Sequence, residues 1–365
     1  GDGSWPGIDY RHQGRGAWSP RKHLSRLRLL AAAYAAPESK FFRNRELLTA
    51  VLRGLDFWAA QDPQSPNWWH SEIGTPQQLL GVMLLLGDDL PPEYPEKFRG
   101  ILDRSRPGMT GQNKVWLAGI HLLKGVLYQR PELVREGRKQ ILSELRLAAP
   151  GREGIQSDWS FHQHGPQQQF GNYGLSFLCN MSFYSELFAG TPLAFDRRQQ
   201  DILVSLLLKG YQWIVWRGYW DVNGLNRQLF HSADIHKSFN LLFAAYSLMK
   251  GSNDQQAREI KELIARNFLH PDMNNEFTGN KFFGDSDLTI HRTPHWMASV
   301  RMASDRVIGT ELVNEDNLKG YYMADGAIYT YIRGDEYHNI FPFWDWRRIP
   351  GITTYESDAP IPTES

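Results

Sequence analysis

Amphipathic helical periodicity runs through most of this sequence, from about Arg21 to Leu269. Apolar residues recur there at three- and four-residue spacing, and short runs rich in Pro, Gly and Asp separate the segments. The clearest segments are HLSRLRLLAAAYA, ELLTAVLRGLDFWAA, PQQLLGVMLLLG, NKVWLAGIHLLKGVLY and SADIHKSFNLLFAAYSLMKG. Helices that follow one another with no strand signal between them predict helical hairpins around a central cleft or a compact irregular bundle. Periodicity alone does not choose between the two.

The pattern changes near Gly284, where short runs rich in β-branched and aromatic residues begin. The runs WMASVRM, GYYMADGAIYTYI and HNIFPFWDW are separated by turn sequences such as NEDN, DG and RGDE. We therefore expect a helical domain over residues 1–283 and the start of a β domain over residues 284–365. The strands are too few to cover both faces of a sandwich, so we expect the sequence to be a fragment.

The charge of the chain is balanced, with 40 Lys and Arg against 40 Asp and Glu in 365 residues. No global basic field would gather nucleic acid or an anionic membrane, so an anionic ligand must be attracted by a local site. Aromatic residues are abundant, since Trp, Tyr and Phe make up 13% of the chain. Flat rings pack well against the C–H faces of sugars, which favours a carbohydrate ligand for some of them. Ordinary core packing accounts for most.

Cys179 is the single cysteine and lies in the apolar run LSFLCNMSF, which predicts a buried thiol. One cysteine excludes an intramolecular disulfide and a cysteine-based metal cluster. The sequence has no apolar stretch approaching the length of a membrane span and no recognisable signal peptide. Because it begins at Gly1 without Met, removal of a signal peptide is compatible with it, and a secreted or periplasmic location is expected.

The segment IQSDWSFHQHGPQQQFGNYGLSFL, residues 155–178, is the most polar interruption of the helical pattern. Gly165 and Pro166 would end any helix that contains His164, and Tyr173 stands at the entry to the next apolar run. A loop histidine and a tyrosine at a helix start can face one cleft. Loops this rich in hydrogen-bonding groups are commonly functional sites.

Three further polar segments are NWWHSE, TGQNKVW and DVNGLNRQ. Asn113 precedes the apolar run VWLAGIHLL and fits a helix N-cap as well as it fits a ligand-binding amide. Arg227, taken by itself, fits a surface residue better than a site residue. Trp68 and Trp69 are neighbours that point in different directions on a helix, so one of them should be exposed.

Taken in order, these segments resemble polysaccharide lyase family 8, the chondroitin AC, hyaluronate and xanthan lyases, over nearly the whole chain. The resemblance rests on an Asn-Trp-Trp patch at residues 67–69, a Thr-Gly-x-Asn helix start at residues 110–113, and a Gln-His pair followed nine residues later by Tyr. Further matches are His291-Arg292, Trp296, Ser304-x-Arg306, Glu311, Asn314, Asp316-Asn317, Lys319-Gly320 and the IPGIT run from Ile349 to Thr353. Each motif is weak alone, but their order is specific.

The resemblance implies an α+β multidomain fold, an incomplete α/α toroid of helical hairpins followed by the beginning of an antiparallel β-sandwich domain. It also implies β-elimination beside a uronate, in which Asn113 neutralises the carboxylate. Tyr173 would serve as base and acid, with His164 as helper or alternative base. A free phenol titrates near about 10, so action near neutral pH needs nearby cations to lower its pKa. Arg227 would supply one such charge, with Glu311 orienting it.

Asn67, Trp68 and Trp69 are expected to bind sugar units of the polymer. Asn223 is expected at the substrate as well, because relatives carry there the first of two arginines in an R-x-x-x-R pattern. The asparagine removes one cation unless another group, such as His231 or His164, replaces it.

No cofactor is expected for catalysis, because the helical half shows no cluster of carboxylates or His at metal-ligand spacing. A structural calcium in the β part is left open. The expected partner is an acidic polysaccharide, bound by a monomer, with no nucleic acid and no membrane. A glycoside hydrolase would need a carboxylate pair, for which Asp158 and Glu311 are the candidates. A binding protein without turnover would keep the tryptophan pair but would have no need of Tyr173 or Asn113.

Overall fold

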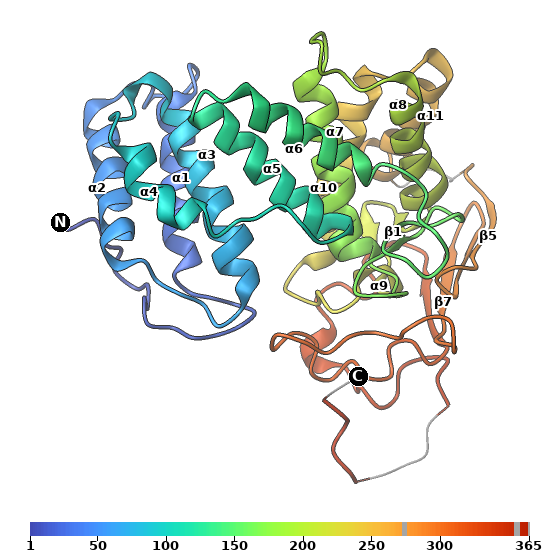
Figure 1. Ribbon diagram of the computed structural model, residues 1–365. Helices are drawn as coiled ribbons and strands as arrows, with labels where there is room; N and C mark the ends of the chain where they lie inside the picture. The colour runs from blue at the N-terminus through green and yellow to red at the C-terminus, as the bar shows by residue number, and fades with distance from the viewer. Residues whose placement is uncertain (272–275, 354–357, 364–365) are drawn as a thin grey trace. The chain divides into compact units, whose positions relative to one another are not determined.

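The computed structural model describes residues 1–271, 276–353 and 358–363, and the chain forms two compact units (Figure 1). The first unit comprises Gly1–Met109 and Trp116–Leu142, and the second comprises Thr110–Val115 and Ser143–Ser365. Helix α5 (Gly111–Leu127) begins in the second unit and continues in the first.

The first unit is helical. Besides most of α5, its elements are α1 (Arg21–Ala35), α2 (Arg45–Gln61), the π-helical turn η1 (His70–Gly74), α3 (Thr75–Leu86), the 3₁₀ turn η2 (Gly87–Asp89), α4 (Tyr94–Leu102) and α6 (Pro131–Ser143). Leu27 on α1 is fully buried beside Gly54 on α2. A Cβ at Gly54 would lie 2.4 Å from the Leu27 side chain, so the glycine lets the two helices approach closely. Apolar burial at this spacing is what stabilises an amphipathic helix bundle.

The second unit contains helices, short strand pairs and a sheet. Its helical elements are the π turn η3 (Phe170–Gly174), α7 (Leu175–Phe188), α8 (Arg197–Ser205), the π turn η4 (Leu206–Gly210), the 3₁₀ turn η5 (Tyr211–Trp213), α9 (Val222–Leu225), α10 (Ala233–Lys250), α11 (Asp254–Ile264), the π turn η6 (Ala265–Leu269) and the 3₁₀ turn η7 (Phe341–Phe343). Its strands are β1 (Gly154–Ile155), β2 (Phe161–His162), β3 (Val215–Trp216), β4 (Tyr219–Trp220), β5 (Gly279–Phe283), β6 (Leu288–Arg292), β7 (Met297–Arg301) and β8 (Ala327–Tyr331).

Strands β5 to β8 form an antiparallel sheet in sequence order. Alternate residues of β7 and β8 are buried, as expected for a sheet with one covered face. That face contacts α9, because the amide of Asn223 donates to Ser299 Oγ at 2.9 Å and the backbone N–H of Val222 donates to the Tyr331 hydroxyl at 2.8 Å. The sheet thus supports the segment that leads to Arg227.

A helical N-terminal part followed by an antiparallel sheet confirms the predicted fold class. The expectation of helices without strands between them is wrong, because two short antiparallel pairs, β1 with β2 and β3 with β4, interrupt them. The run HNIFPFWDW is not a strand, since its Pro-containing centre forms the 3₁₀ turn η7. Cys179 is half-buried as a whole residue, and burial raises the pKa of its thiol to about 12, in agreement with the predicted buried thiol. Among the described residues, no helix combines the length and apolarity needed to cross a membrane.

Candidate active site

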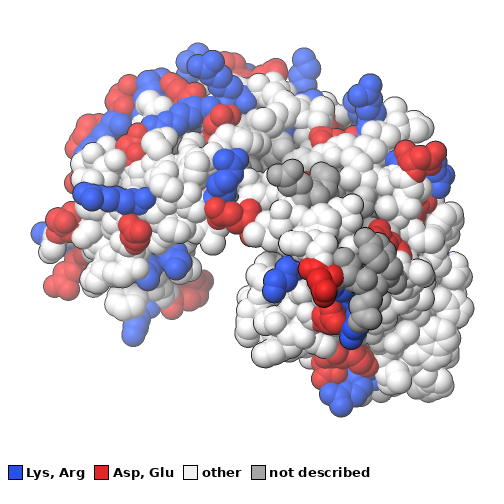
Figure 2. Space-filling view, turned by 90° about the horizontal axis from the view of Figure 1, so that it is seen from below, with Lys and Arg blue, Asp and Glu red and all other residues white. Residues whose placement is uncertain are grey.

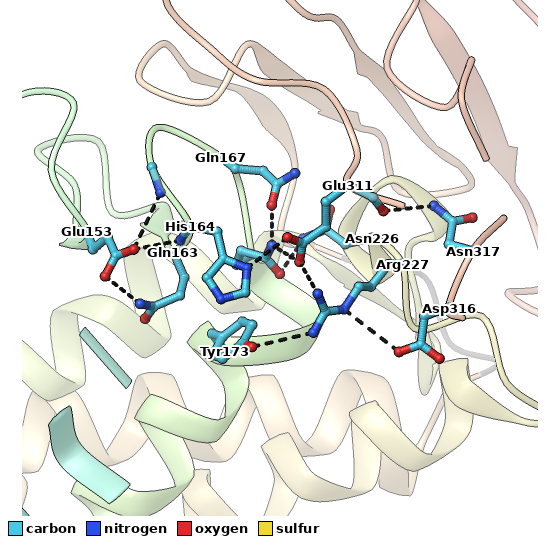
Figure 3. A network of polar contacts seen from close by, with 12 residues as sticks. Glu153, Gln163, His164, Gln167, Tyr173, Asn226, Arg227, Glu311, Asp316 and Asn317 are labelled. Carbon is cyan, nitrogen blue, oxygen red and sulfur yellow. Dashed lines mark hydrogen bonds and ion pairs between the residues drawn. The ribbon is translucent and has the colours of Figure 1, made fainter. Parts of the chain in front are cut away.

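Four of the predicted site residues, His164, Tyr173, Arg227 and Glu311, lie together in the second unit (Figure 3). Tyr173 stands on the π turn η3, and His164 lies in the loop after β2 with a left-handed φ of 60°. Arg227 follows α9, and Glu311 comes from the connection between β7 and β8. The cluster therefore joins groups that are far apart in the sequence.

Glu311 is the centre of the cluster. One carboxylate oxygen accepts from Arg227 Nη1 at 2.5 Å, and the other lies 2.7 Å from His164 Nδ1. A carboxylate can only accept, so His164 Nδ1 carries the hydrogen and Nε2 keeps its lone pair when the ring is neutral. Arg227 Nη2 also donates to the Tyr173 hydroxyl at 3.4 Å, and the His164 and Tyr173 rings lie 4.7 Å apart. A base, a hydroxyl and a cation are thus held within one network.

Burial raises the pKa of Tyr173, and the Arg227 guanidinium offsets this in part, while Glu311 raises it further. Arg227 therefore lowers the pKa of this phenol, as expected of a nearby cation, but desolvation outweighs the arginine and the net pKa is raised. Burial would also raise the pKa of Glu311, but the hydrogen bond from His164 and the charge of Arg227 hold it below its usual value. Glu311 is an anion and Tyr173 a neutral phenol at neutral pH.

Arg227 is buried, contrary to the surface position that the sequence favoured. Its Nε lies 3.8 Å from Asp316, and it borders a cavity of about 580 Å³. Phe341 and Trp346 line the same cavity.

Asn113 is not the N-cap of α5, because the helix begins two residues earlier, at Gly111. Its side chain is buried, and its Oδ1 has no hydrogen-bond partner among the described residues. The start of α5 is joined to the histidine loop, since the backbone N–H of Gln112 donates to Gln163 Oε1 at 2.8 Å. The Asn113 side-chain carbonyl oxygen thus retains the capacity to accept a hydrogen bond.

Glu153 is a site residue that the sequence did not indicate. Its carboxylate accepts from the backbone N–H of His164 at 2.8 Å and of Gly165 at 3.4 Å, from the Gln163 amide, and from the Thr110 hydroxyl. Both His164 and Gly165 have left-handed φ, which turns their N–H groups toward one anion. A lone Glu between Arg152 and Gly154 carries no sequence signal for this role.

Two further residues missed by the sequence connect the cluster to the sheet. Arg301 on β7 donates to Asn226 Oδ1 at 2.6 Å, and the Asn226 amide donates to Gln169 Oε1 at 3.3 Å. The Gln169 amide in turn donates to Glu311 at 3.1 Å. The glutamine run had marked this segment as polar, but the partner on β7 is more than a hundred residues away in the sequence.

Asn223 does not face a ligand, which corrects the expectation of a substrate contact. It is fully buried, and its amide donates to Ser299 Oγ and to the carbonyl of Ala327. The residue four positions after Arg227 is His231, which is exposed.

The predicted aromatic patch lies in the first unit. Both amide atoms of Asn67 are used within the protein, since Nδ2 donates to the carbonyl of Arg15 and Oδ1 accepts from the N–H of Trp69. Trp69 packs edge-on against Trp116 at 5.5 Å. Trp68 is 38% exposed, which agrees with the expectation that one of the two tryptophans is exposed.

The described residues contain no group of three or more His, Cys, Asp or Glu placed to hold a metal ion. The network's own groups are a carboxylate, a guanidinium, an imidazole and a phenol. This set can transfer protons and stabilise negative charge.

Two family models match the chain. The N-terminal alpha-helical domain of polysaccharide lyase family 8 matches residues 2–266, and the super-sandwich domain of the same family matches residues 278–365. These matches define the class as that of the polysaccharide lyases. The chain belongs to polysaccharide lyase family 8.

Individual relatives agree with this assignment. A chondroitinase-AC of Pedobacter heparinus is 29% identical over 99% of this chain and 52% of its own length. A hyaluronate lyase of Thermasporomyces composti is 25% identical over 92% of the chain and 49% of its own length. A solved chondroitinase AC lyase structure has a TM-score of 0.89 at 28% identity, covering 100% of this chain and 55% of the other. The chain thus spans about half the length of the curated relatives it matches.

Proposed function

We propose that this protein cleaves a uronic-acid-containing polysaccharide of the chondroitin sulfate or hyaluronan type by β-elimination. The observation that carries the proposal is the single network through which Glu311 joins Arg227 and His164 beside the Tyr173 hydroxyl. Its support from relatives is that the similar proteins include a chondroitinase-AC and hyaluronate lyases.

In the proposed reaction, Asn113 donates to the uronate carboxylate and stabilises the charge that builds up when C5 loses its proton. His164 Nε2 accepts that proton, since its Nδ1 is directed to Glu311. Tyr173 donates its phenol proton to the leaving glycosidic oxygen. Its raised pKa keeps that proton in place at neutral pH, and Arg227 stabilises the phenolate that remains. The resemblance assigned both proton removal and proton donation to Tyr173. The raised pKa of Tyr173 favours instead His164 as the base and Tyr173 as the acid.

The elimination leaves a C4–C5 double bond, which absorbs in the ultraviolet, whereas hydrolysis leaves saturated ends. The test is to incubate the full-length protein with chondroitin, dermatan, hyaluronan, xanthan and alginate and to follow this absorbance. Unsaturated products from a chondroitin or hyaluronan substrate are expected. Saturated products would refute the lyase proposal. Activity on xanthan alone would refute the proposed chondroitin or hyaluronan substrate while keeping the lyase reaction.

Replacing Tyr173 by Phe removes the proposed acid while keeping the ring. We expect kcat to fall by about 10² to 10⁴, as for the loss of a general acid, with substrate binding largely retained. Single-turnover product formation and oligosaccharide binding should be measured on the same preparation. Normal turnover by the Phe variant would remove Tyr173 from its assigned role.

The hydrolase alternative needs Asp158 as a partner of Glu311, and the contacts of Asp158 do not favour it. One Asp158 oxygen accepts from the N–H and hydroxyl of Ser160, and the other accepts from the N–H of Asp285 at 2.7 Å. The Asp158 carboxylate thus connects two loops by hydrogen bonds.

Because the proposed substrate is an extracellular polymer, we also propose a secreted or periplasmic location for a monomeric enzyme.

A further inference from the structure

Acidic polymers must be recognised here by local charge, because the chain has as many acidic as basic residues. Figure 2 shows Lys and Arg interspersed with Asp and Glu over the face that it presents, without one extended basic field. Attraction of an anion therefore requires a local pocket whose Lys or Arg side chains are not already paired with carboxylates.

The second unit contains a cavity of about 850 Å³, within the roughly 300–1,000 Å³ typical of ligand pockets. Its wall includes four charged side chains, Glu144, Arg146, Arg152 and Glu153. A second cavity of about 690 Å³ is lined by three glutamates beside one arginine, which is the wrong balance for an acidic ligand.

The two carboxylates of the first cavity already have partners. Glu144 accepts from the backbone N–H of Gly111 at 2.8 Å and forms an ion pair with Lys114 at 2.9 Å. Glu153 accepts from the histidine loop, as described above. Arg146 and Arg152 are both exposed, and neither forms an ion pair with a carboxylate of the described residues. The cavity therefore offers two guanidinium groups to an incoming anion.

The cavity borders the catalytic network without containing it. Thr110, three residues before Asn113, and Gly165, next to His164, both line its wall. Tyr173 and Arg227 are not among the lining residues. An occupant would lie beside the loop that carries the proposed base, so it would be a neighbour of the reacting sugar and not that sugar itself.

We propose that this cavity binds an acidic group, a carboxylate or a sulfate ester, on a sugar unit next to the one that reacts, with Arg146 and Arg152 as the recognising cations. The inference rests on the proposed function, because it assumes a polymer that extends beyond the reacting unit. Arg146 and Arg152 would supply the local positive charge that attracts an acidic ligand to a chain of balanced charge.

The experiment uses the full-length protein with Arg146→Ala, Arg152→Ala and both together, assayed on unsulfated hyaluronan and on chondroitin sulfate. Each single change should raise KM about fivefold to tenfold with kcat within about twofold, and the double variant should be less sensitive to salt. Arg258→Ala is the matched control, since it removes one exposed arginine on α11, away from the cavity. Arg146→Lys should recover part of the loss by keeping the charge.

Higher KM on both polymers identifies the ligand as the uronate carboxylate, and higher KM on chondroitin sulfate alone identifies the sulfate ester. An unchanged KM in the double variant, or an equal rise in Arg258→Ala, overturns the proposal. Oligosaccharide binding, measured by calorimetry in a Tyr173→Phe background, separates the two inferences. Arginine-dependent binding by a protein that makes no unsaturated product would refute the lyase function and leave the anion site standing.

Discussion

At the scale of single residues, Glu153 connects two parts of the candidate site. Through Thr110 and Gln163 it contacts the start of α5, which carries Asn113, and through backbone N–H groups it holds the loop of His164. Its negative charge also raises the pKa of Tyr173, after the larger effects of burial, Arg227 and Glu311. One side chain thus affects both the position of the proposed base and the proton of the proposed acid.

Glu153→Gln should lower kcat about tenfold to a hundredfold without raising KM, because an amide cannot accept from all of these donors at once. Removing the charge should also lower the pKa of Tyr173. The acid must be protonated to act, so the alkaline limb of the pH profile of kcat/KM should move to lower pH. Steady-state kinetics across pH would measure both effects.

Glu144→Gln is the matched control, because Glu144 binds Gly111 and Lys114 at the same helix start but does not contact the histidine loop. We expect it to reduce stability while leaving the alkaline limb in place. If both variants moved that limb equally, or if Glu153→Gln raised KM alone, the role assigned to Glu153 would be wrong.

At the scale of elements, the site depends on how closely η3 approaches α9. A Cβ at Gly171 on η3 would lie 2.4 Å from the carbonyl oxygen of Gly224 and 3.0 Å from the Cα of Leu225. Both are backbone atoms, so the two elements would have to separate. Tyr173 and Arg227 lie on or just after these elements, so the separation would weaken the contact between them.

Gly171→Ala should therefore destabilise the protein by about 1–3 kcal/mol and lower kcat. Gly100→Ala in α4 is the control, because a Cβ there meets nothing within 4 Å and φ is ordinary. That change should be neutral or stabilise the protein by up to about 1 kcal/mol. Denaturant titration would measure the free energy of unfolding of both variants, and initial rates would measure kcat. Equal losses in the two variants would contradict the proposed role of the contact between η3 and α9.

The sequence predicted the helices well because their stability comes from local periodicity, as in HLSRLRLLAAAYA, which lies within α1. It also marked His164 and Tyr173, which share one polar segment. It could not predict that Asn223 faces the sheet, that Arg227 is buried, or that Glu153 holds the histidine loop. Those outcomes depend on partners distant in the sequence, such as Ser299 for Asn223, and periodicity contains no information on such pairs.

At the scale of the whole molecule, buried titratable groups differ between the two units. Burial lowers the pKa of His23 in the first unit and of His162 in the second to about 4 each. In the second unit, burial raises the pKa of Asp221 to about 6. In the first unit, burial also lowers the pKa of His70 and His121.

These shifts predict that acid weakens the first unit more than the second. A histidine whose pKa is depressed on folding contributes stability that is complete above about 6.5 and is lost as pH falls to about 4, because the unfolded chain binds the proton first. Asp221 acts in the opposite direction, since its folded form binds a proton below about 6 while the unfolded carboxyl does not until about 4. Each shift of this size corresponds to about 3 kcal/mol, so His162 and Asp221 largely cancel, while the lowered pKa values of the first-unit histidines all act in the same direction. The measurement is hydrogen exchange from pH 6.5 to 4, corrected for the intrinsic pH dependence. Helices α1 and α2 should lose more protection over this range than α7 and α10. His23→Gln, which removes the titration, should reduce that difference, and equal pH slopes in the two units would contradict the prediction.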